Sequence, residues 1–253
     1  MSVPRLEYKY LVPIAHRGNL RKALLPFMTP DEYLQSGERA DYTVRSVYLD
    51  TPDLECFHEK LEGVALRKKY RIRGYDRVQS DSIVFLEIKK KTYHHVTKSR
   101  APLLQQDVAY VLNTGLYPVS SLSQESDGTE QQSADQFLFY YYRKNLRPVI
   151  LIVYEREAFI GRYDRSLRVT LDKNIRSIPC STYDFHREPL RDTFSRYFIL
   201  EVKFRQAVPP WVPSIIRRFD LQRTSVSKYA ICMELHKIRR RLLGSSFLSS
   251  TAT

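Results

Sequence analysis

The chain has few cysteines and no long hydrophobic run. Its three cysteines, Cys56, Cys180 and Cys232, are odd in number and widely spaced, and none belongs to a CxxC pair. This pattern argues against a disulfide framework and against a structural zinc site. No stretch approaches the roughly 18 apolar residues of a membrane span, and residues 1–9 lack the apolar run of a secretory signal. We therefore expect a cytoplasmic protein in a reducing compartment.

Acidic residues are scarce relative to basic ones. The 253 residues include 41 Lys and Arg but only 28 Asp and Glu, which gives a net charge of +13. Such an excess attracts polyanions, and the candidates are nucleic acid, an anionic membrane and a phosphorylated small molecule. Hydrophobic residues make up 43% of the chain, which is ample for a packed core at this length.

We expect one domain over residues 1–253. Residues 118–135 contain very few apolar side chains, which predicts a mobile loop. Residues 227–253 are predicted to form a basic helix and tail. The basic residues from Lys237 to Arg241 leave contact with a membrane or a transporter partner open, although a solvated helix end is the default expectation.

Six segments alternate side chains of different polarity with a period of two, the pattern of a strand whose two faces differ. In residues 66–75, four cations share one face and apolar residues share the other. The same alternation predicts strands over 5–12, 84–91, 150–159, 167–172 and 198–204. Apolar residues at helical spacing predict helices from Thr51 to Gly63, over 103–114 and 135–145, after Pro210, and from Ser227 to Leu242.

The charged strand faces need an explanation. A single such face is usually a solvated one. However, residues 67–100 hold eleven Lys or Arg against three acids, and like charges opposite one another destabilise a sheet. A sheet closed into a barrel, with its charged face inward and helices outside, would gather these cations around a bound polyanion. Arg forks and Lys ammonium groups match phosphate oxygens, and carboxylates among them would hold a divalent metal. Glu7, Glu87 and Glu201 are in register for that role.

Several short motifs together resemble a known family. Their order and spacing are similar to those of the CYTH-like triphosphate tunnel metalloenzymes, and more closely to the vacuolar transporter chaperone (VTC) branch. The VTC domain is a polyphosphate polymerase in fungi and also occurs as bacterial stand-alone proteins. The resemblance runs from about residue 5 to residue 235. The motifs are Arg5-x-Glu7-x-Lys9-Tyr10, the run from Ser46 to Asp53, Arg71-x-Arg73, Glu87-Ile88-Lys89, Lys98-x-Arg100, Tyr154-x-Arg156, Arg168-x-Thr170-Leu171-Asp172, Glu201-Val202-Lys203 and Ser227-Lys228-Tyr229.

The resemblance implies an α+β fold with a closed antiparallel barrel of about eight strands and helices packed outside. It implies an ATP-dependent polyphosphate polymerase with Mn²⁺ or Mg²⁺ as cofactor, and ATP with polyphosphate or triphosphate as substrates. The expected catalytic cations are Arg71, Arg73, Lys89, Arg156 and Arg168. The expected phosphate-binding residues are Lys9, Lys98, Arg100, Tyr154, Lys203, Ser227 and Lys228. The expected metal ligands are Glu201, with Glu7 and Glu87.

Two departures from the family pattern bear on activity. Many tunnel hydrolases begin with Glu-x-Glu-x-Lys, whereas this chain has Arg5 in place of the first Glu, which fits the polymerase branch. Ser225 stands where that branch can carry another Lys, and Arg223 is a candidate substitute. A tri- or polyphosphate hydrolase of the same fold and a non-catalytic module that binds polyphosphate or inositol phosphate remain alternatives. We expect no nucleic acid partner, because no RNP-like or helix-turn-helix signature is present.

Overall fold

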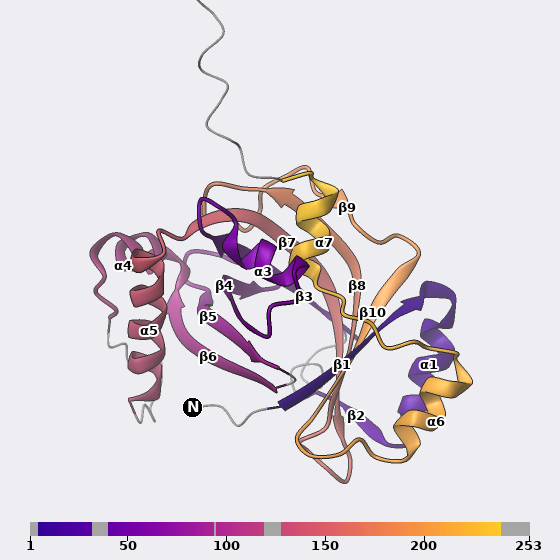
Figure 1. Cartoon of the computed structure of the whole chain (residues 1–253). Coiled ribbons are helices and arrows are strands. Elements are labelled where there is room, and N and C mark those ends of the chain that lie inside the picture. Colours follow the sequence, from indigo (N-terminus) through magenta and orange to yellow (C-terminus); the bar gives the residue numbers. More distant parts are fainter. Residues whose placement is uncertain (1–4, 32–39, 94, 119–127, 239–253) are drawn as a thin grey trace, which may run out of the picture.

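The computed structural model describes residues 5–31, 40–93, 95–118 and 128–238 (Figure 1). Its centre is an antiparallel sheet of ten strands in the order β2-β7-β3-β4-β5-β6-β1-β10-β8-β9. The strands are β1 (Arg5–Pro13), β2 (Met28–Pro30), β3 (Tyr42–Asp50), β4 (Leu66–Tyr75), β5 (Ile83–Thr92), β6 (His95–Leu104), β7 (Arg147–Gly161), β8 (Arg168–Pro179), β9 (Arg191–Asp192) and β10 (Tyr197–Phe204). The α+β class expected from the sequence is confirmed.

The strand pairings return to the strand at which they begin. β7 pairs with β3 on one side and with β8 on the other. The series therefore runs from β7 through β3, β4, β5, β6, β1, β10 and β8, and then back to β7. Strand β2 pairs with β7, and strand β9 pairs with β8. The long strands β7 and β8 pair from Ile150 to Ile160, with a register shift between Val153 and Glu155.

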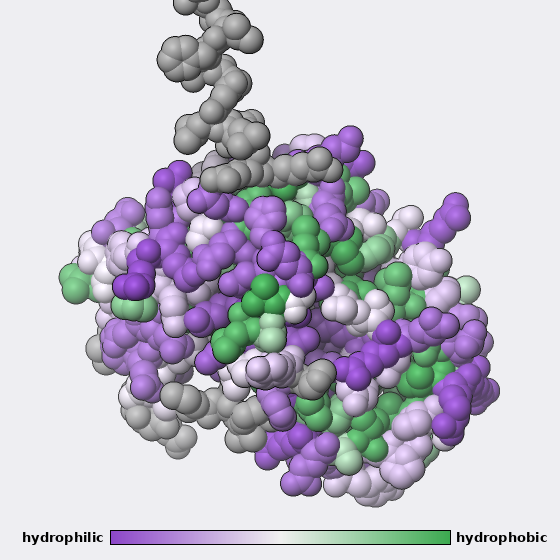
Figure 2. Space-filling model, in the orientation of Figure 1, coloured by the Kyte–Doolittle hydropathy of each residue, from purple (hydrophilic) through white to green (hydrophobic). Residues whose placement is uncertain are grey.

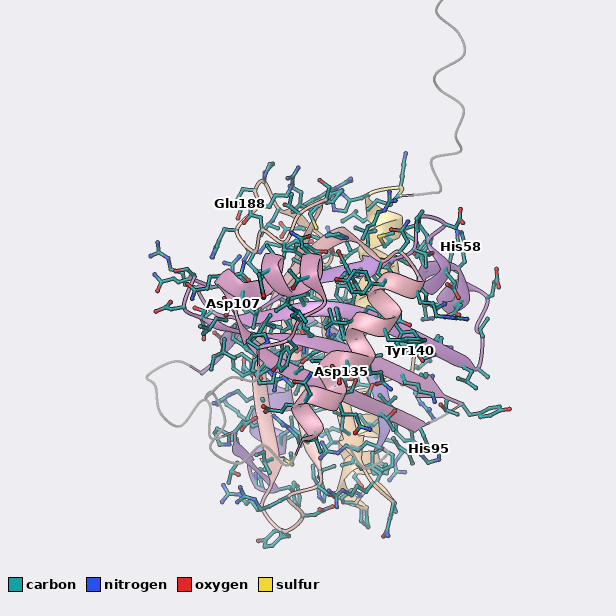
Figure 3. The ribbon with its side chains drawn as sticks, turned by 90° about the vertical axis from the view of Figure 1, so that its left-hand side faces the viewer. His58, His95, Asp107, Asp135, Tyr140 and Glu188 are labelled. Atoms are coloured by element: carbon teal, nitrogen blue, oxygen red, sulfur yellow. The ribbon has the colours of Figure 1, made fainter. Side chains whose placement is uncertain are left out.

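The outer face of the sheet is apolar and its inner face is polar, which is the reverse of the usual arrangement. Along β4, Tyr70 and Ile72 are buried in the main hydrophobic cluster, whereas the alternate residues Arg71 and Arg73 face the interior. Helices cover the apolar face on two sides. The helix α5 crosses over β5 and β6 (Figure 3), and it contributes Phe137 to that cluster.

A second hydrophobic cluster lies under α1 and α6. It contains Leu20 of α1, Ile215 of α6, and residues of β1, β8 and β10 such as Val12 and Phe198. The rings of Phe27 and Trp211 stack at 4.5 Å beside it. In the space-filling view of Figure 2, hydrophobic residues are visible near α1 and α6, around α7 and near the centre of the view, and hydrophilic residues surround them. The interior of the strand circuit is thus left to polar side chains.

The helices are α1 (Arg17–Leu24), α3 (Glu55–Leu61), α4 (Val108–Thr114), α5 (Thr129–Arg143), α6 (Trp211–Arg218) and α7 (Lys228–Leu235), with 3-10 turns at Ile14–His16 and Gln105–Asp107. Three sequence predictions differ from them. Residues 129–135 of the expected 118–135 loop belong to α5, and residues 119–127 lie outside the described part. The segment 103–107 completes β6 and a 3-10 turn before α4. The last helix ends at Leu235, and residues 239–253 lie outside the described part.

Asp50, at the end of β3, fixes the start of α3. Its carboxylate accepts hydrogen bonds from the backbone N–H groups of Thr51, Cys56 and Phe57 at 2.8, 2.9 and 3.1 Å. The helix therefore begins at Glu55, four residues after the start predicted at Thr51, and the Thr51 hydroxyl accepts the backbone N–H of Glu55 at 3.0 Å. The hydroxyl of Tyr229 in α7 donates to the same carboxylate, so Asp50 joins α3 to α7.

In the described residues, no helix combines the length and the apolar character that crossing a membrane requires. Cys56, Cys180 and Cys232 are buried free thiols.

Candidate functional site

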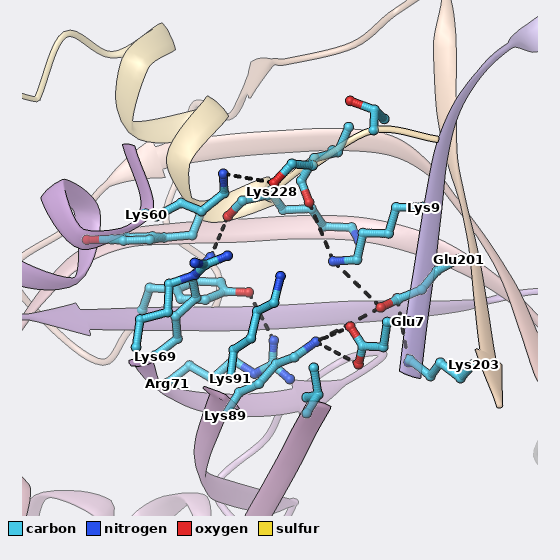
Figure 4. A pocket seen from close by; sticks show the side chains of 18 of the residues that line it. Glu7, Lys9, Lys60, Lys69, Arg71, Lys89, Lys91, Glu201, Lys203 and Lys228 are labelled. Atoms are coloured by element: carbon cyan, nitrogen blue, oxygen red, sulfur yellow. Dashed lines mark hydrogen bonds and ion pairs between the residues drawn. The ribbon is translucent and has the colours of Figure 1, made fainter. Parts of the chain in front are cut away.

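The polar interior of the strand circuit contains a cavity of about 410 Å³ (Figure 4). The inward side chains of β1, β3, β4, β5, β7 and β10 line it, together with the end of α3 and the segment that leads into α7. Among the described residues, its lining includes twelve Lys or Arg side chains and two carboxylates, Glu7 and Glu201. The cations are Lys9, Lys60, Arg67, Lys69, Arg71, Arg73, Lys89, Lys91, Arg156, Lys203, Arg223 and Lys228.

Arg71 and Arg73 are held rigidly on β4. The Nε of Arg71 donates to Glu87 at 2.7 Å, and its Nη1 donates to the hydroxyl of Tyr48 at 3.0 Å. Arg73 donates from Nε to Ser46 Oγ at 3.0 Å and from Nη2 to the Tyr154 hydroxyl at 3.2 Å. Because both side chains are already oriented, little conformational entropy is lost when they bind an anion.

Glu87 is the counter-ion behind this pair. It is fully buried and lies within 4.0 Å of four cations, which are Arg71, Arg73, Lys98 and Arg100. Burial alone would raise the pKa of Glu87, but Arg71, Arg73 and Lys98 outweigh it and hold the pKa well below its ordinary value. Glu87 is also outside the cavity lining, so the structure does not place it where a metal ion in the cavity would lie, which is the role expected from the sequence.

A second buried carboxylate, Asp172, is the counter-ion on the opposite side of the cavity. Arg156 donates to both of its oxygens, from Nε at 2.6 Å and from Nη2 at 2.8 Å, and Lys228 donates to Oδ2. Burial opposes ionisation, but the charges of Arg156 and Lys228 lower the pKa of Asp172. This buried carboxylate fixes a bidentate Arg and the first residue of α7 together.

Glu7 and Glu201 face the cavity from the adjacent strands β1 and β10. Lys89 Nζ donates to both carboxylate oxygens of Glu7, at 2.9 Å to Oε1 and 2.7 Å to Oε2. Glu201 has four longer ion pairs, at 3.5 Å to Lys203, 3.6 Å to Lys9, 3.9 Å to Arg156 and 4.0 Å to Lys89.

The charge state of Glu201 follows from its neighbours. Although burial opposes it, the cations led by Lys203 and Lys9 hold the pKa of Glu201 well below its ordinary value. Its carboxylate is therefore ionised, and it is loosely held by its partners. Within the described ranges no group of three or more His, Cys, Asp or Glu side chains could bind a metal ion by itself. Glu201, with Glu7 nearby, fits a hard divalent cation that takes its other oxygen ligands from phosphate.

The segment Arg223–Ser227 lies along the cavity before α7. Lys60 Nζ donates to Ser225 Oγ at 3.2 Å, and Lys69 Nζ donates to Ser227 Oγ at 2.5 Å. Ser227 also caps α7 by accepting from the N–H of Ala230. Arg223 stacks over Tyr8 with its guanidinium carbon 3.8 Å from the ring centroid. Lys60 of α3 thus brings a cation to Ser225, and Arg223, the candidate substitute for a Lys at that position, also lines the cavity.

The structure brings most of the expected site residues together. Those that line the cavity are Lys9, Arg71, Arg73, Lys89, Tyr154, Arg156, Lys203, Ser227, Lys228, Glu7 and Glu201. Lys98 and Arg100 lie outside the lining on β6, where Arg100 stacks 3.2 Å from the centroid of Phe85. Arg168 also lies outside it and pairs with Asp31.

Several residues that line the cavity were not among the expected site residues. The alternation placed Arg67, Lys69 and Lys91 on the charged faces of β4 and β5, and these faces point into the cavity. Tyr48 lies on β3, which no alternation predicted. Lys60 comes from a helix, and no local pattern indicates that it reaches the strands.

This arrangement is that of a polyanion-binding protein, in which cations from an antiparallel sheet surround one cavity. A family model described as the VTC domain matches residues 4–237, and the chain belongs to that family.

Two relatives carry the name vacuolar transporter chaperone complex subunit 4. The one from Trypanosoma brucei brucei (strain 927/4 GUTat10.1) is 27% identical, over 81% of this chain and 30% of its own length. The one from Schizosaccharomyces pombe (strain 972 / ATCC 24843) is 26% identical, over 70% of this chain and 29% of its own length. The chain therefore spans less than a third of the curated relatives that it matches.

Two solved structures show a more distant similarity. A putative adenylyl cyclase, HpAC1, from Hippeastrum has a TM-score of 0.49 at 13% identity, over 91% of this chain and 95% of that one. The PH1819 protein from Pyrococcus horikoshii OT3 has a TM-score of 0.46 at 14% identity, over 92% and 99%.

Proposed function

We propose that the chain is a polyphosphate polymerase, which binds ATP by its phosphates and transfers the γ-phosphoryl group to the end of a polyphosphate chain. The observation that carries the proposal is the cavity itself, with twelve cations and two carboxylates in its described lining. Mutual repulsion among so many cations around one cavity is relieved when an anion of high charge density enters. Membership of the VTC family and the names of the two relatives support the same reading.

The circuit of eight strand pairings acts as a closed barrel in this proposal, and its interior is a tunnel for the phosphate chain. An antiparallel barrel presents alternate residues inward on every strand, which explains why cations distant in sequence meet at one place. A tunnel also lets a growing polymer extend away from the nucleotide.

The residues of the cavity suit phosphoryl transfer. In this reaction the bond between the γ-phosphorus and its bridging oxygen breaks, a terminal oxygen of the acceptor chain bonds to that phosphorus, and ADP leaves. The transition state is loose, so catalysis depends on alignment and on stabilisation of charge on the phosphoryl oxygens. Glu87 fixes Arg71, Ser46 and Tyr154 fix Arg73, and Asp172 fixes Arg156, and the remaining N–H groups of these guanidinium groups would hold the reacting phosphates in line.

Glu201 would hold a divalent cation, Mn²⁺ or Mg²⁺, with Glu7 beside it. Such a cation offsets negative charge on bound phosphate oxygens. Lys203 and Lys9 keep Glu201 ionised, and their ion pairs with it are long. The carboxylate of Glu201 therefore remains accessible among the cations.

The decisive experiment incubates the purified protein with ATP and Mn²⁺ and scores the products. Long polyphosphate supports the polymerase. Orthophosphate alone indicates a hydrolase, in which water replaces the chain as acceptor, and neither product indicates a binding module.

Two variants then test the residues. We expect Arg71→Ala and Arg73→Ala each to abolish chain growth, whereas Arg77→Ala, an exposed residue just beyond β4, should retain it. Chain growth by both cavity variants would exclude the mechanism.

A further inference from the structure

The helix α5 packs one face on the sheet and leaves the opposite face uncovered. Its residues Ala134, Phe137 and Leu138 are buried over β5 and β6. From position 132 to the end of the helix, the exposed residues recur every three or four positions. They form a single line along the outer side, which we name the α5 stripe: Gln132, Asp135, Gln136, Phe139, Tyr142 and Arg143. Figure 3 looks onto this helix, with Asp135 labelled on it.

The middle of the α5 stripe is aromatic. Phe139 is 55% exposed and Tyr142 is 50% exposed. The hydroxyl of Tyr142 donates to the carbonyl of Leu112 at 2.8 Å, so the end of α4 lies beside its ring. Leu116, two residues beyond α4, is 62% exposed. Large apolar side chains that gather on one surface, rather than being scattered singly, are typical of a protein–protein contact.

The charges of the α5 stripe are not neutralised within the chain. Among the described residues, neither Asp135 nor Arg143 forms an ion pair. Asp135 accepts a hydrogen bond from the neutral amide of Gln131 at 2.7 Å, and the guanidinium carbon of Arg143 lies 5.8 Å from the centroid of Phe139. By contrast, the next residue, Lys144, pairs with Glu55 at 2.6 Å. The stripe therefore presents one negative and one positive charge to an external partner.

These two charges are placed symmetrically about Phe139. Asp135 is four residues before Phe139 and Arg143 is four residues after it, which is about 6 Å along the helix in each direction. Consider a second copy of α5, antiparallel to the first and related to it by a two-fold axis through Phe139. Asp135 of each copy then lies opposite Arg143 of the other, and the two Phe139 rings meet on the axis.

A contact between identical surfaces has to be self-complementary, and the α5 stripe meets that condition. Gln136 and Tyr142, three residues on either side of Phe139, also come opposite each other across the axis. No position of the stripe is then opposed by a like charge. An unrelated partner would not require opposite charges at equal distances from a central aromatic ring.

We propose that the α5 stripe joins two copies of this chain in an antiparallel dimer with two-fold symmetry. From Gln132 to Arg143 the stripe is only about 17 Å long, so it buries less than the roughly 800 Å² per partner of a standard interface. The dissociation constant is therefore in the micromolar range. Because α5 lies on the outer face of β5 and β6, the contact leaves the two cavities separate, and the inference does not depend on the proposed function.

The test exchanges the charges of the α5 stripe. Asp135→Arg places two cations opposite each other at both ends of the contact, and Arg143→Asp places two carboxylates opposite each other. Each variant alone should therefore be monomeric. In an equimolar mixture of the two, opposite charges face each other at both ends, so the mixture should form a heterodimer. The double variant with both substitutions restores the two pairs and should dimerise with itself.

Sedimentation velocity over roughly 1 to 200 µM protein, at fixed ionic strength, measures the dissociation constant. Each single variant should weaken the dimer roughly tenfold or more, because two attractive contacts become repulsive. The mixture and the double variant should return to within about threefold of the unchanged protein. Asp81→Arg and Arg77→Asp are the matched controls, since they reverse exposed charges outside α5 and should leave the dissociation constant unchanged.

Thermal unfolding of each variant confirms that it is folded, and rescue in the mixture excludes misfolding as the cause of a monomer. An unchanged protein that stays monomeric over the whole concentration range overturns the dimer. A mixture that remains monomeric overturns the antiparallel arrangement. Single variants that dimerise as well as the unchanged protein, or controls that weaken it equally, show that α5 is not the contact.

Discussion

Replacement of Glu87 by glutamine should destabilise the fold strongly. The substitution keeps the size of the side chain but removes the negative charge that Glu87 places among Arg71, Arg73, Lys98 and Arg100. Removing one partner of a buried ion pair costs about 3–5 kcal/mol, because the other charge stays buried. Glutamine can still accept one hydrogen bond, so we expect the lower end of that range, about 3 kcal/mol.

Urea unfolding measures this effect. With a urea dependence of about 3 kcal/mol per molar, a loss of 3 kcal/mol lowers the unfolding midpoint by about 1 M. Glu55→Gln is the matched control. Glu55 also pairs with a cation, Lys144 at 2.6 Å, but its side chain is 42% exposed. Exposed pairs contribute at most about 1 kcal/mol, so this control should shift the midpoint by less than about 0.3 M.

The effect of Glu87 should depend on pH in a definite direction. Its folded-state pKa lies well below the ordinary value of 4.5, so its stabilisation is fully present above 4.5 and is lost as the pH falls toward the folded-state pKa. The midpoints of the unchanged protein and the variant should therefore converge in acid. Equal midpoints at neutral pH, or a difference that grows in acid, would refute the role of Glu87 as the common counter-ion.

Three further predictions follow from the site. Glu201→Gln should raise the Mn²⁺ concentration needed for half-maximal chain growth and strengthen metal-free tripolyphosphate binding, because a negative charge is removed; an unchanged Mn²⁺ titration would contradict this. The pKa of Lys69 is lowered from 10.5, so anion binding should take up protons, and the affinity for polyphosphate should fall as the pH rises toward 10.5. The affinity of Lys69→Met should fall less steeply, and calorimetry at several pH values would show the difference. Asp50→Ala removes three backbone hydrogen bonds and the Tyr229 contact, and it should lower the free energy of unfolding in urea by about 3 kcal/mol. The control Asp81→Ala, at an exposed residue, should lower it by less than about 0.5 kcal/mol.

The strands whose two faces differ sharply could be predicted from the sequence. Residues 66–75 and 84–91 alternate so regularly that the inward positions of Arg71, Arg73 and Lys89 follow from the period of two. The strand β3 was not predicted from alternation, because its inward positions include Val44 and Tyr48 and it reads as a largely apolar run. When a tyrosine hydroxyl provides the polar lining, the strand does not show the alternation of charged and apolar residues.

The site itself was less predictable than the strands. Alternation gives the face on which a residue lies but not which partner it has. It could not reveal that Glu87 is enclosed by four cations, or that Arg168 pairs with Asp31. Both outcomes depend on neighbouring strands and on a segment more than a hundred residues away. Lys60 was missed for the same reason, since its place in the cavity depends on the contact of α3 with α7.

The two ends of the described chain meet at the cavity, and this affects how the protein is made. Thr224 donates its backbone N–H to the carbonyl of Lys9 at 2.8 Å, and Lys9 Nζ donates to the carbonyl of Val226. During translation, β1 leaves the ribosome long before either partner has been synthesised. Contacts so distant in sequence form late. The ring of cations is therefore completed only when Arg223 and Lys228 have emerged, so a chain truncated before them lacks the assembled cavity.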